Sequence, residues 1–109
     1  MFKLKYKIWI DKEGKVFGKG PYDLLSGVEK YGSLSESAKI LNMSYNKAFN
    51  LIKDIEKKLG YELISTKIGG INGGGSKLTK KAKEIMDKYK SFIDECEACL
   101  EPIFKKYFF

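Results

Sequence analysis

The chain has 109 residues, with 21 lysines and no arginine against 14 acidic residues, which gives a formal net charge of +7 at pH 7. That length suits one compact domain, and the positive balance favours a polyanionic partner such as nucleic acid or an anionic membrane surface. The absence of histidine excludes histidine-based metal sites and histidine general bases, and no apolar run approaches the length of a membrane span.

Apolar residues alternate with mostly basic ones from Phe2 to Ile10, which predicts a half-buried strand. The residues Asp11-Lys12-Glu13-Gly14 predict a turn, and Lys15-Val16-Phe17 predict a short return strand, so a β-hairpin is expected before the helices. Lysines at every second position near the start are unlike a signal peptide, so a cytoplasmic protein is expected.

A first helix is predicted after a linker at Gly18–Gly20. Pro21 suits the first helical position, where its missing N–H costs nothing, and Gly32 suits the end. The expected buried stripe of this helix is Leu24, Leu25, Val28 and Tyr31.

The stretch from Ser33 to Gly60 predicts two helices that meet at a tight turn. Ser35 is a suitable N-cap for a helix that runs to about Leu41, and Asn42 tolerates the left-handed conformation that ends it. Ser44 is expected to cap a second, longer helix that ends at Gly60. The spacing of the apolar residues is that of a helix-turn-helix, and their inward face is Ala38, Leu41, Met43, Ala48, Leu51, Ile52 and Ile55.

The opposite face of the second helix is predicted to enter a nucleic-acid groove. Asparagine pairs two hydrogen bonds with an adenine edge, and lysine neutralises phosphate. Guanine readout favours arginine, so the lack of arginine suggests an A·T preference. The predicted contacts are Ser44, Tyr45, Asn46, Lys47, Asn50 and Lys53. The alternative is a helical hairpin whose polar face is merely solvated.

After Gly60, a strand is predicted at Tyr61–Thr66, followed by a segment with five glycines within seven residues, Lys67–Leu78. So much glycine cannot hold a regular strand throughout, so a loop between two short strands is expected: the wing of a winged helix. Lys67, Asn72 and Lys77 are predicted to contact DNA there. The alternatives are a plain flexible loop and a phosphate cradle, although the GxxxxGK[ST] pattern is missing.

A long helix is predicted from Lys80 to about Leu100, capped by Thr79. Its apolar residues recur at heptad spacing, which predicts a homodimer about this helix. The residues expected in that interface are Ile85, Tyr89, Phe92, Ile93, Cys96 and Leu100. The alternative is that the hairpin covers the whole stripe. Pro102 is expected to end or kink the helix, and the aromatic tail Ile103–Phe109 is expected to be buried on its own subunit, across the dimer or against another protein.

Cys96 and Cys99 form a CxxC pair one helical turn apart on the apolar stripe. They are expected to stay reduced and to pack as small hydrophobes, with no metal and no cofactor. The alternative is that two paired helices bring four thiols together, which would suit zinc or an iron–sulfur centre. No catalytic constellation is present, so the protein is not expected to be an enzyme.

These residues together resemble the N-terminal DNA-binding domain of ModE-type molybdate-responsive transcription regulators, which is close to LysR-type domains. The resemblance covers nearly the whole chain: KYKIWID, then GPYDLLSGVEKYGSLSESAKILNMSYNKAFNLI, and most specifically the glycine-rich GGINGGGSKLTKKAKEI. It implies an α+β, mainly helical winged helix-turn-helix with an N-terminal hairpin, a glycine-rich wing and a long dimerisation helix. The helix from Ser44 to Leu59 would enter the major groove.

The resemblance further implies a single domain over residues 1–109, with hairpin, helix-turn-helix and wing in 1–78 and the dimerisation helix and tail in 79–109. The implied function is sequence-specific DNA binding and transcription regulation as a homodimer on double-stranded DNA. Nothing in the chain resembles the molybdate-binding domains of full-length members. Two alternatives therefore stay open: a winged-helix module that binds protein, and a regulator that takes a molybdate or other oxyanion signal from a separate chain.

Overall fold

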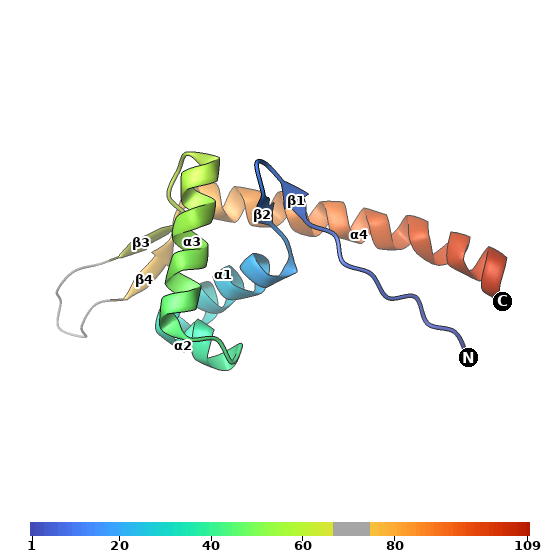
Figure 1. Cartoon of the computed structure of the whole chain (residues 1–109), viewed down its shortest axis with the longest axis horizontal. Helices are drawn as coiled ribbons and strands as arrows, with labels where there is room; N and C mark the ends of the chain where they lie inside the picture. The colour runs from blue at the N-terminus through green and yellow to red at the C-terminus, as the bar shows by residue number, and fades with distance from the viewer. Residues whose placement is uncertain (67–74) are drawn as a thin grey trace.

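The computed structural model describes residues 1–66 and 75–109, and these form four helices and two small antiparallel hairpins (Figure 1). In chain order the elements are β1 (Ile10–Asp11), β2 (Lys15–Phe17), α1 (Lys19–Tyr31), α2 (Leu34–Ile40), α3 (Tyr45–Leu59), β3 (Ile64–Thr66), β4 (Ser76–Leu78) and α4 (Lys80–Phe108). The molecule measures 57 × 28 × 21 Å because the far half of α4 extends well beyond the rest.

Hydroxyl caps begin three of the helices. Ser33, Ser44 and Thr79 each accept a hydrogen bond from the backbone N–H three residues later, at 3.0, 3.2 and 3.1 Å. The caps predicted at Ser44 and Thr79 are confirmed, whereas the cap predicted at Ser35 is wrong. Ser33 has the extended backbone that lets its hydroxyl reach forward, and Ser35 already lies inside α2.

The first helix starts earlier than predicted, because α1 includes Lys19 and Gly20. Pro21 occupies its third position, where the N–H has no helical partner in any case, so the ring is tolerated. Gly32 ends the helix in the left-handed conformation, as expected. Tyr31 was predicted to be buried but is 44% exposed, since it lies at the very end of the helix with the Lys30 ammonium over its ring.

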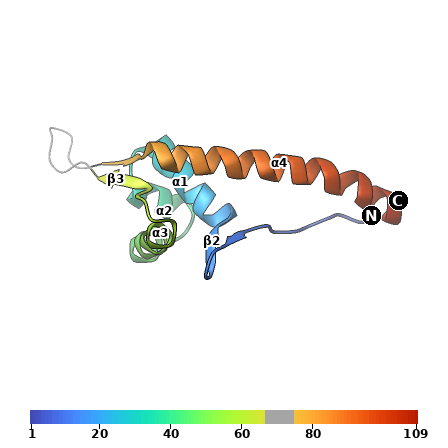
Figure 2. The ribbon, with the colours of Figure 1, turned by 90° about the horizontal axis from the view of Figure 1, so that it is seen from above.

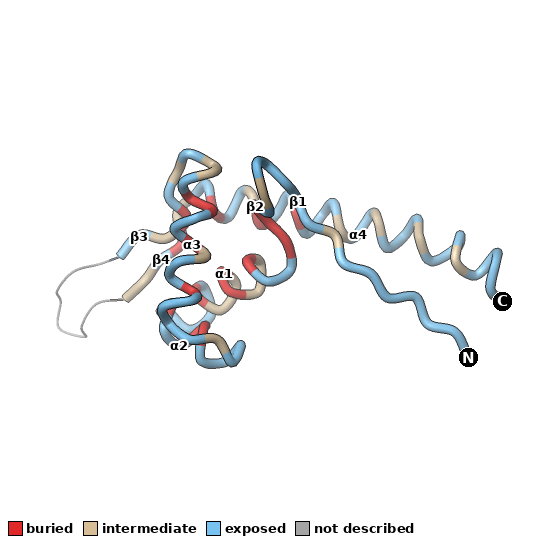
Figure 3. The backbone as a smooth tube through the Cα atoms, viewed as in Figure 1, coloured by how far each residue is buried: buried red, intermediate tan, exposed pale blue. Residues whose placement is uncertain are grey.

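The core lies where α1, α3, β2 and the first turns of α4 meet (Figure 3). Phe17, Leu24, Leu25, Ala48 and Leu63 are completely buried there. The rest of the cluster is Val16, Val28, Leu34, Ala38, Ile52, Ile55, Leu78, Ala82, Met86 and Tyr89. Both hairpins contribute to this core, so the strands and helices of the chain form one packed unit.

Helices α1 and α2 approach very closely at Gly27. A Cβ atom at Gly27 would lie 2.0 Å from the hydroxyl oxygen and 2.7 Å from the Cβ of Ser37. Ser37 is itself buried, and its hydroxyl donates a 2.6 Å hydrogen bond to the carbonyl of Leu24. Glycine at position 27 therefore sets the distance between the two helices.

The predicted N-terminal strand is wrong over most of its length, because only β1 pairs with β2. Residues 1–9, which we call the N-terminal arm, have no strand beside them and run along α4 instead, so that the two termini lie close together (Figures 1 and 2). The Tyr89 hydroxyl donates a 2.8 Å hydrogen bond to the Ile8 carbonyl, and the rings of Phe2 and Phe108 meet edge to face at 5.7 Å.

The last helix does not end near Leu100, and Pro102 lies inside it. Proline removes one N–H and so leaves the carbonyl of Ala98 without its helical partner, but Ala98 is exposed and water can satisfy that carbonyl. The aromatic tail is consequently helical. It is not buried within a single copy of the chain, since Tyr107 and Phe109 are 70% and 69% exposed.

The Gly27→Ala substitution is expected to destabilise the protein by about 1–3 kcal/mol, because the added methyl group overlaps Ser37 and forces α1 and α2 apart. Gly20→Ala in the same helix is the matched control, since a Cβ atom there meets nothing within 4 Å. It should change the free energy of unfolding far less, because the gain from alanine in a helix is offset by Pro21, which disfavours the helical conformation in the residue before it. Urea denaturation of both variants measures the difference, and equal midpoints would contradict the close approach.

Candidate nucleic-acid interface

The position of α3 is fixed by its inner face. Ala48, Ile52 and Ile55 are 0–2% exposed and pack into the core, with Leu51 half-buried beside them. These positions recur every three or four residues, so the opposite side of the helix is left in solvent. The inward residues predicted for this helix are confirmed.

The outward face of α3 holds the predicted contact residues. Tyr45, Asn46, Lys47, Asn50 and Lys53 are all exposed, and within residues 1–66 and 75–109 the side chains of Asn46, Lys47 and Asn50 make no hydrogen bond or ion pair. Amide and ammonium groups in this state keep their full hydrogen-bonding capacity for a ligand. The face is therefore polar, cationic and available.

Ser44 precedes this face and is also exposed, but its oxygen accepts the Lys47 N–H at 3.2 Å as the helix cap. Its hydroxyl proton remains available to a phosphate oxygen. Its first role is to begin the helix.

Phe49 belongs to the same face, although the sequence interpretation left it out. It is 40% exposed, its ring stacks on Tyr45 with centroids 6.0 Å apart, and the Lys53 ammonium lies 5.4 Å over it. The spacing of four residues from Tyr45 to Phe49 to Lys53 is the signal that would have found this row. An exposed aromatic ring beside asparagines offers apolar contact to a thymine methyl group or a sugar.

The turn between α2 and α3 has the predicted form. Asn42 adopts a positive φ of 56°, and the Met43 N–H donates a 2.9 Å hydrogen bond to the Ala38 carbonyl. Ala38 is buried where the helices cross, as expected, and Met43 is half-buried. Leu41 was predicted to face inward but is 37% exposed, because the chain reverses direction directly after it.

A buried carboxylate ties the second hairpin to α3. Glu56 is 9% exposed and accepts hydrogen bonds from the N–H groups of Leu63 at 2.7 Å and Ile64 at 3.3 Å. The Lys53 ammonium lies 3.3 Å from its other oxygen. Charge-assisted bonds of this kind are about twice as strong as neutral ones, so β3 is held firmly against the end of α3.

The second hairpin has a strand on each side of the predicted wing, although β3 covers only the last three residues of the strand predicted at Tyr61–Thr66. Strands β3 and β4 pair antiparallel, with Ser65 opposite Lys77, and the Ser76 N–H donates a 3.0 Å hydrogen bond to the Gly32 carbonyl. Lys77 is exposed, as predicted. Lys67, Asn72 and the glycine-rich loop of the predicted wing lie outside the described residues.

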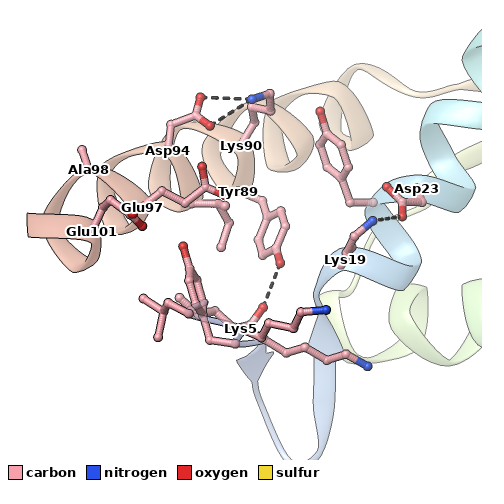
Figure 4. A pocket seen from close by; sticks show the side chains of 15 residues that line it. Lys5, Lys19, Asp23, Tyr89, Lys90, Asp94, Glu97, Ala98 and Glu101 are labelled. Carbon is pink, nitrogen blue, oxygen red and sulfur yellow. Dashed lines mark hydrogen bonds and ion pairs between the residues drawn. The ribbon is translucent and has the colours of Figure 1, made fainter. Parts of the chain in front are cut away.

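A groove of about 1270 Å³ separates the N-terminal arm from α4 and the start of α1 (Figure 4). Two of its lysines are paired with carboxylates: Lys19 with Asp23 at 2.7 Å and Lys90 with Asp94 at 3.0 Å. Burial raises the pKa of the Tyr89 phenol, which keeps it protonated as the donor to the arm. Because cations and carboxylates alternate here, the groove is not an oxyanion site of concentrated positive charge.

The residues predicted for dimerisation divide into two groups. Ile85 and Tyr89 lie near the body and pack against its core, so a single copy already covers them in large part. Phe92 is 44% exposed, whereas Ile93, Cys96 and Leu100 are half-buried. Only the far half of α4 therefore leaves apolar surface uncovered.

Two negative findings hold for residues 1–66 and 75–109. None of the helices there is long and apolar enough to cross a membrane. A single copy of this part of the chain also holds no group of three histidine, cysteine or acidic side chains placed to bind a metal ion.

Known proteins similar in sequence are ModE proteins. The chain is 30% identical over 78 residues to the molybdenum transport protein ModE of Azotobacter vinelandii, a match that covers 72% of the chain and 29% of that protein. It is 32% identical over 66 residues to the transcriptional regulators ModE of Yersinia pestis and Haemophilus influenzae, covering 61% of the chain and 25% and 26% of those proteins. The matches span less than a third of the length of these curated relatives. No protein-family profile matches the chain.

Among solved structures, the chain is similar to the DNA-binding domain of CbnR in its complex with DNA. The TM-score is 0.60 at 15% identity, and the match covers 80% of the chain and 94% of that domain. The predicted resemblance to ModE-type regulators and to LysR-type domains is thus confirmed, and the chain has the winged-helix fold.

The Glu56→Ala substitution is expected to lower the free energy of unfolding by about 2–3 kcal/mol, because it leaves the buried N–H of Leu63 without a partner. Glu62→Ala is the matched control, since that residue is exposed and only its backbone carbonyl is used. Hydrogen exchange should show faster exchange at Leu63 and Ile64 in the first variant only. Unchanged exchange there would contradict the link between α3 and β3.

Proposed function

We propose that the chain is a sequence-specific DNA-binding transcription regulator that reads double-stranded DNA with α3 and the wing. The observation that carries the proposal is the exposed face of α3, where Asn46, Lys47 and Asn50 have no partner among residues 1–66 and 75–109 and lie beside the row from Tyr45 to Lys53. A helix of this width fits the major groove. Two of the ModE relatives are transcriptional regulators and the CbnR domain is in complex with DNA, which supports the same function.

The roles divide by chemistry. Asn46 and Asn50 are assigned to base edges, because a side-chain amide forms a bidentate pair with adenine. Lys47, Lys53 and Lys77, with Lys67 and Asn72 of the predicted wing, are assigned to the phosphate backbone, and Ser44 to a phosphate near the start of α3. Such a protein would work in the cytoplasm, and none of these residues forms a catalytic site.

The active species is proposed to be a homodimer formed by α4. Apolar residues toward its far half recur at positions Phe92, Cys96, Cys99 and Ile103, which we call the α4 seam; Cys96 is half-buried and the other three are exposed. Intervals of four, three and four residues are those of a two-helix coiled coil. Two copies joined along the seam would present two α3 helices to a two-fold related DNA site.

A protein partner in place of DNA is the second candidate function. It is favoured by the exposed aromatic end of α4, where Tyr107, Phe108 and Phe109 are 56–70% exposed. The test is retention on mixed genomic DNA fragments at low salt: a chain of net charge +7 that is not retained would favour this candidate and contradict the first.

Substitutions on α3 are expected to separate base readout from phosphate binding. Asn50→Ala should weaken binding to the preferred DNA sequence by about 1–3 kcal/mol for each half-site and relax the base preference at one position of each half-site. Lys47→Ala should weaken binding to all sequences and make the dependence of log K on log salt less steep by about 0.9 for each half-site.

Lys105→Ala is the control for charge, since Lys105 lies in the last turn of α4, far from α3 (Figure 1). Fluorescence anisotropy at several salt concentrations measures affinity and slope. Equal effects of Lys47→Ala and Lys105→Ala would mean that the α3 face is not the contact surface.

Phe92→Glu is expected to convert the dimer to a monomer, because it puts a carboxylate into an apolar seam, and to lower affinity for a two-fold site at least about tenfold. Ser91→Glu adds the same charge at the neighbouring position, about 100° around the helix. Sedimentation velocity should show a monomer for the first variant and a dimer for the second. A wild-type chain that sediments as a monomer would contradict the proposed dimer.

A further inference from the structure

The α4 seam has an order that a second copy of the same helix can match. From the near end to the far end it carries Phe92, Cys96, Cys99 and Ile103: a large residue, two small ones and a large one. Cys99 and Ile103 are exposed, the latter by 54%, whereas Cys96 is half-buried. The symmetry of this order decides how two copies can pair.

Antiparallel pairing uses this symmetry. With a two-fold axis between Glu97 and Ala98, Phe92 of one copy meets Ile103 of the other, and Cys96 meets Cys99. These four layers are all apolar, and the layer beyond each end places Lys106 of one copy beside Tyr89 of the other, whose hydroxyl bonds the N-terminal arm. Parallel pairing in register would instead place Lys106 against its own copy, which is unfavourable for like charges. Antiparallel pairing also sends the two winged-helix bodies to opposite ends of the paired helices, because the body of each copy lies at one end of its α4 (Figure 1).

We infer that the dimer holds a thiophilic divalent metal ion, with zinc as its representative, between the four thiols of Cys96 and Cys99 from both copies; the inference rests on the proposed homodimer. Each copy contributes two thiols separated by about 4.5 Å along the helix and about 60° around it. The line that joins them is therefore inclined to the helix axis.

The two-fold axis inclines the matching line of the second copy in the opposite sense, so the two lines cross. Four sulfur atoms arranged as two crossed pairs describe a tetrahedron, which is the geometry of structural Cys₄ zinc sites. Two paired helices with axes 8–10 Å apart leave about the width that two zinc–sulfur bonds of roughly 2.3 Å and the cysteine Cβ atoms span. The N-terminal arm lies beside the Cys96 edge of this seam: the Tyr89 hydroxyl bonds the Ile8 carbonyl, and Cys96, two helical turns after Tyr89 on the same side of α4, is half-buried.

Binding is a ligand exchange without oxidation. Four thiols lose four protons, four zinc–sulfur bonds form, and the bound ion gives up its water ligands. The tetrathiolate centre carries a charge of −2, on a dimer whose two chains each carry +7. A metal held in this way would stabilise the dimer, and so the two-fold DNA complex, by a free energy that grows with the logarithm of the ratio of free metal concentration to dissociation constant.

The test is metal binding by the reduced 109-residue chain, prepared without metal and titrated with zinc and, separately, with cobalt(II). We expect half a metal ion per chain and the intense visible absorption of tetrahedral cobalt thiolate. Cys96→Ser and Cys99→Ser should each abolish that spectrum. Ala98→Ser, a similar change to an exposed neighbour on the same helix, should leave stoichiometry and spectrum unchanged.

Sedimentation of the same samples separates the two proposals. A monomer under all conditions would overturn the homodimer and, with it, the metal site. A dimer that takes up no metal, or that binds as much after both cysteines are replaced by serine, would overturn the metal site alone. One ion per chain with the spectrum of two sulfur ligands would also overturn it, because the inference requires all four thiols on one ion.

Discussion

The close approach of α1 and α2 at Gly27 is the constraint on which the rest of the structure depends. The Ser37 hydroxyl occupies the volume that any side chain at position 27 would need, and it donates to the Leu24 carbonyl inside the core. Because α2 is only seven residues long, it has little surface with which to hold its own orientation. The contact with α1 fixes the orientation of α2. The tight turn at Asn42 then fixes the direction of α3 relative to α2.

Helix α3 and the base of the wing form one rigid unit for a related reason. Glu56 faces inward from α3 and accepts the first two N–H groups leading into β3, while Ser76 of β4 donates to the carbonyl of Gly32 at the end of α1. Two elements that would contact DNA at different places are thus fixed to the same core. The exposed face of α3 needs no internal partners, since its opposite side already provides the packing.

The last helix has two different environments along its length. Its first turns complete the core through Ala82, Met86 and Tyr89, and its far half extends into solvent beside the N-terminal arm. The arm covers one flank of that half and leaves Phe92, Cys99 and Ile103 of the α4 seam exposed. Both proposals that involve a second copy, the dimer and the four-thiol site, follow from this division.

The sequence by itself determined the local elements of the protein. Cap residues and left-handed positions located the helix-turn-helix, as at Ser44, Asn42 and Gly60, and heptad spacing located the apolar side of α4. The exposed face of α3 was predictable for the same reason, because 3.6-residue periodicity separates an inner side from an outer one. These features depend on residues a few positions apart, whose geometry the backbone fixes.

Tertiary structure alone decided the features that depend on distant residues. The alternation of apolar and basic residues predicted a strand in the N-terminal arm. A strand needs a neighbouring strand to pair with, and the arm lies along α4 instead. Pro102 was expected to end or kink α4, yet the helix continues through it to Phe108, because Ala98, whose carbonyl loses its helical partner, is exposed. The burial of Glu56 and the contact between Gly27 and Ser37 join segments whose meeting no local pattern encodes. Local chemistry fixed which elements form, and packing between distant segments fixed where they lie.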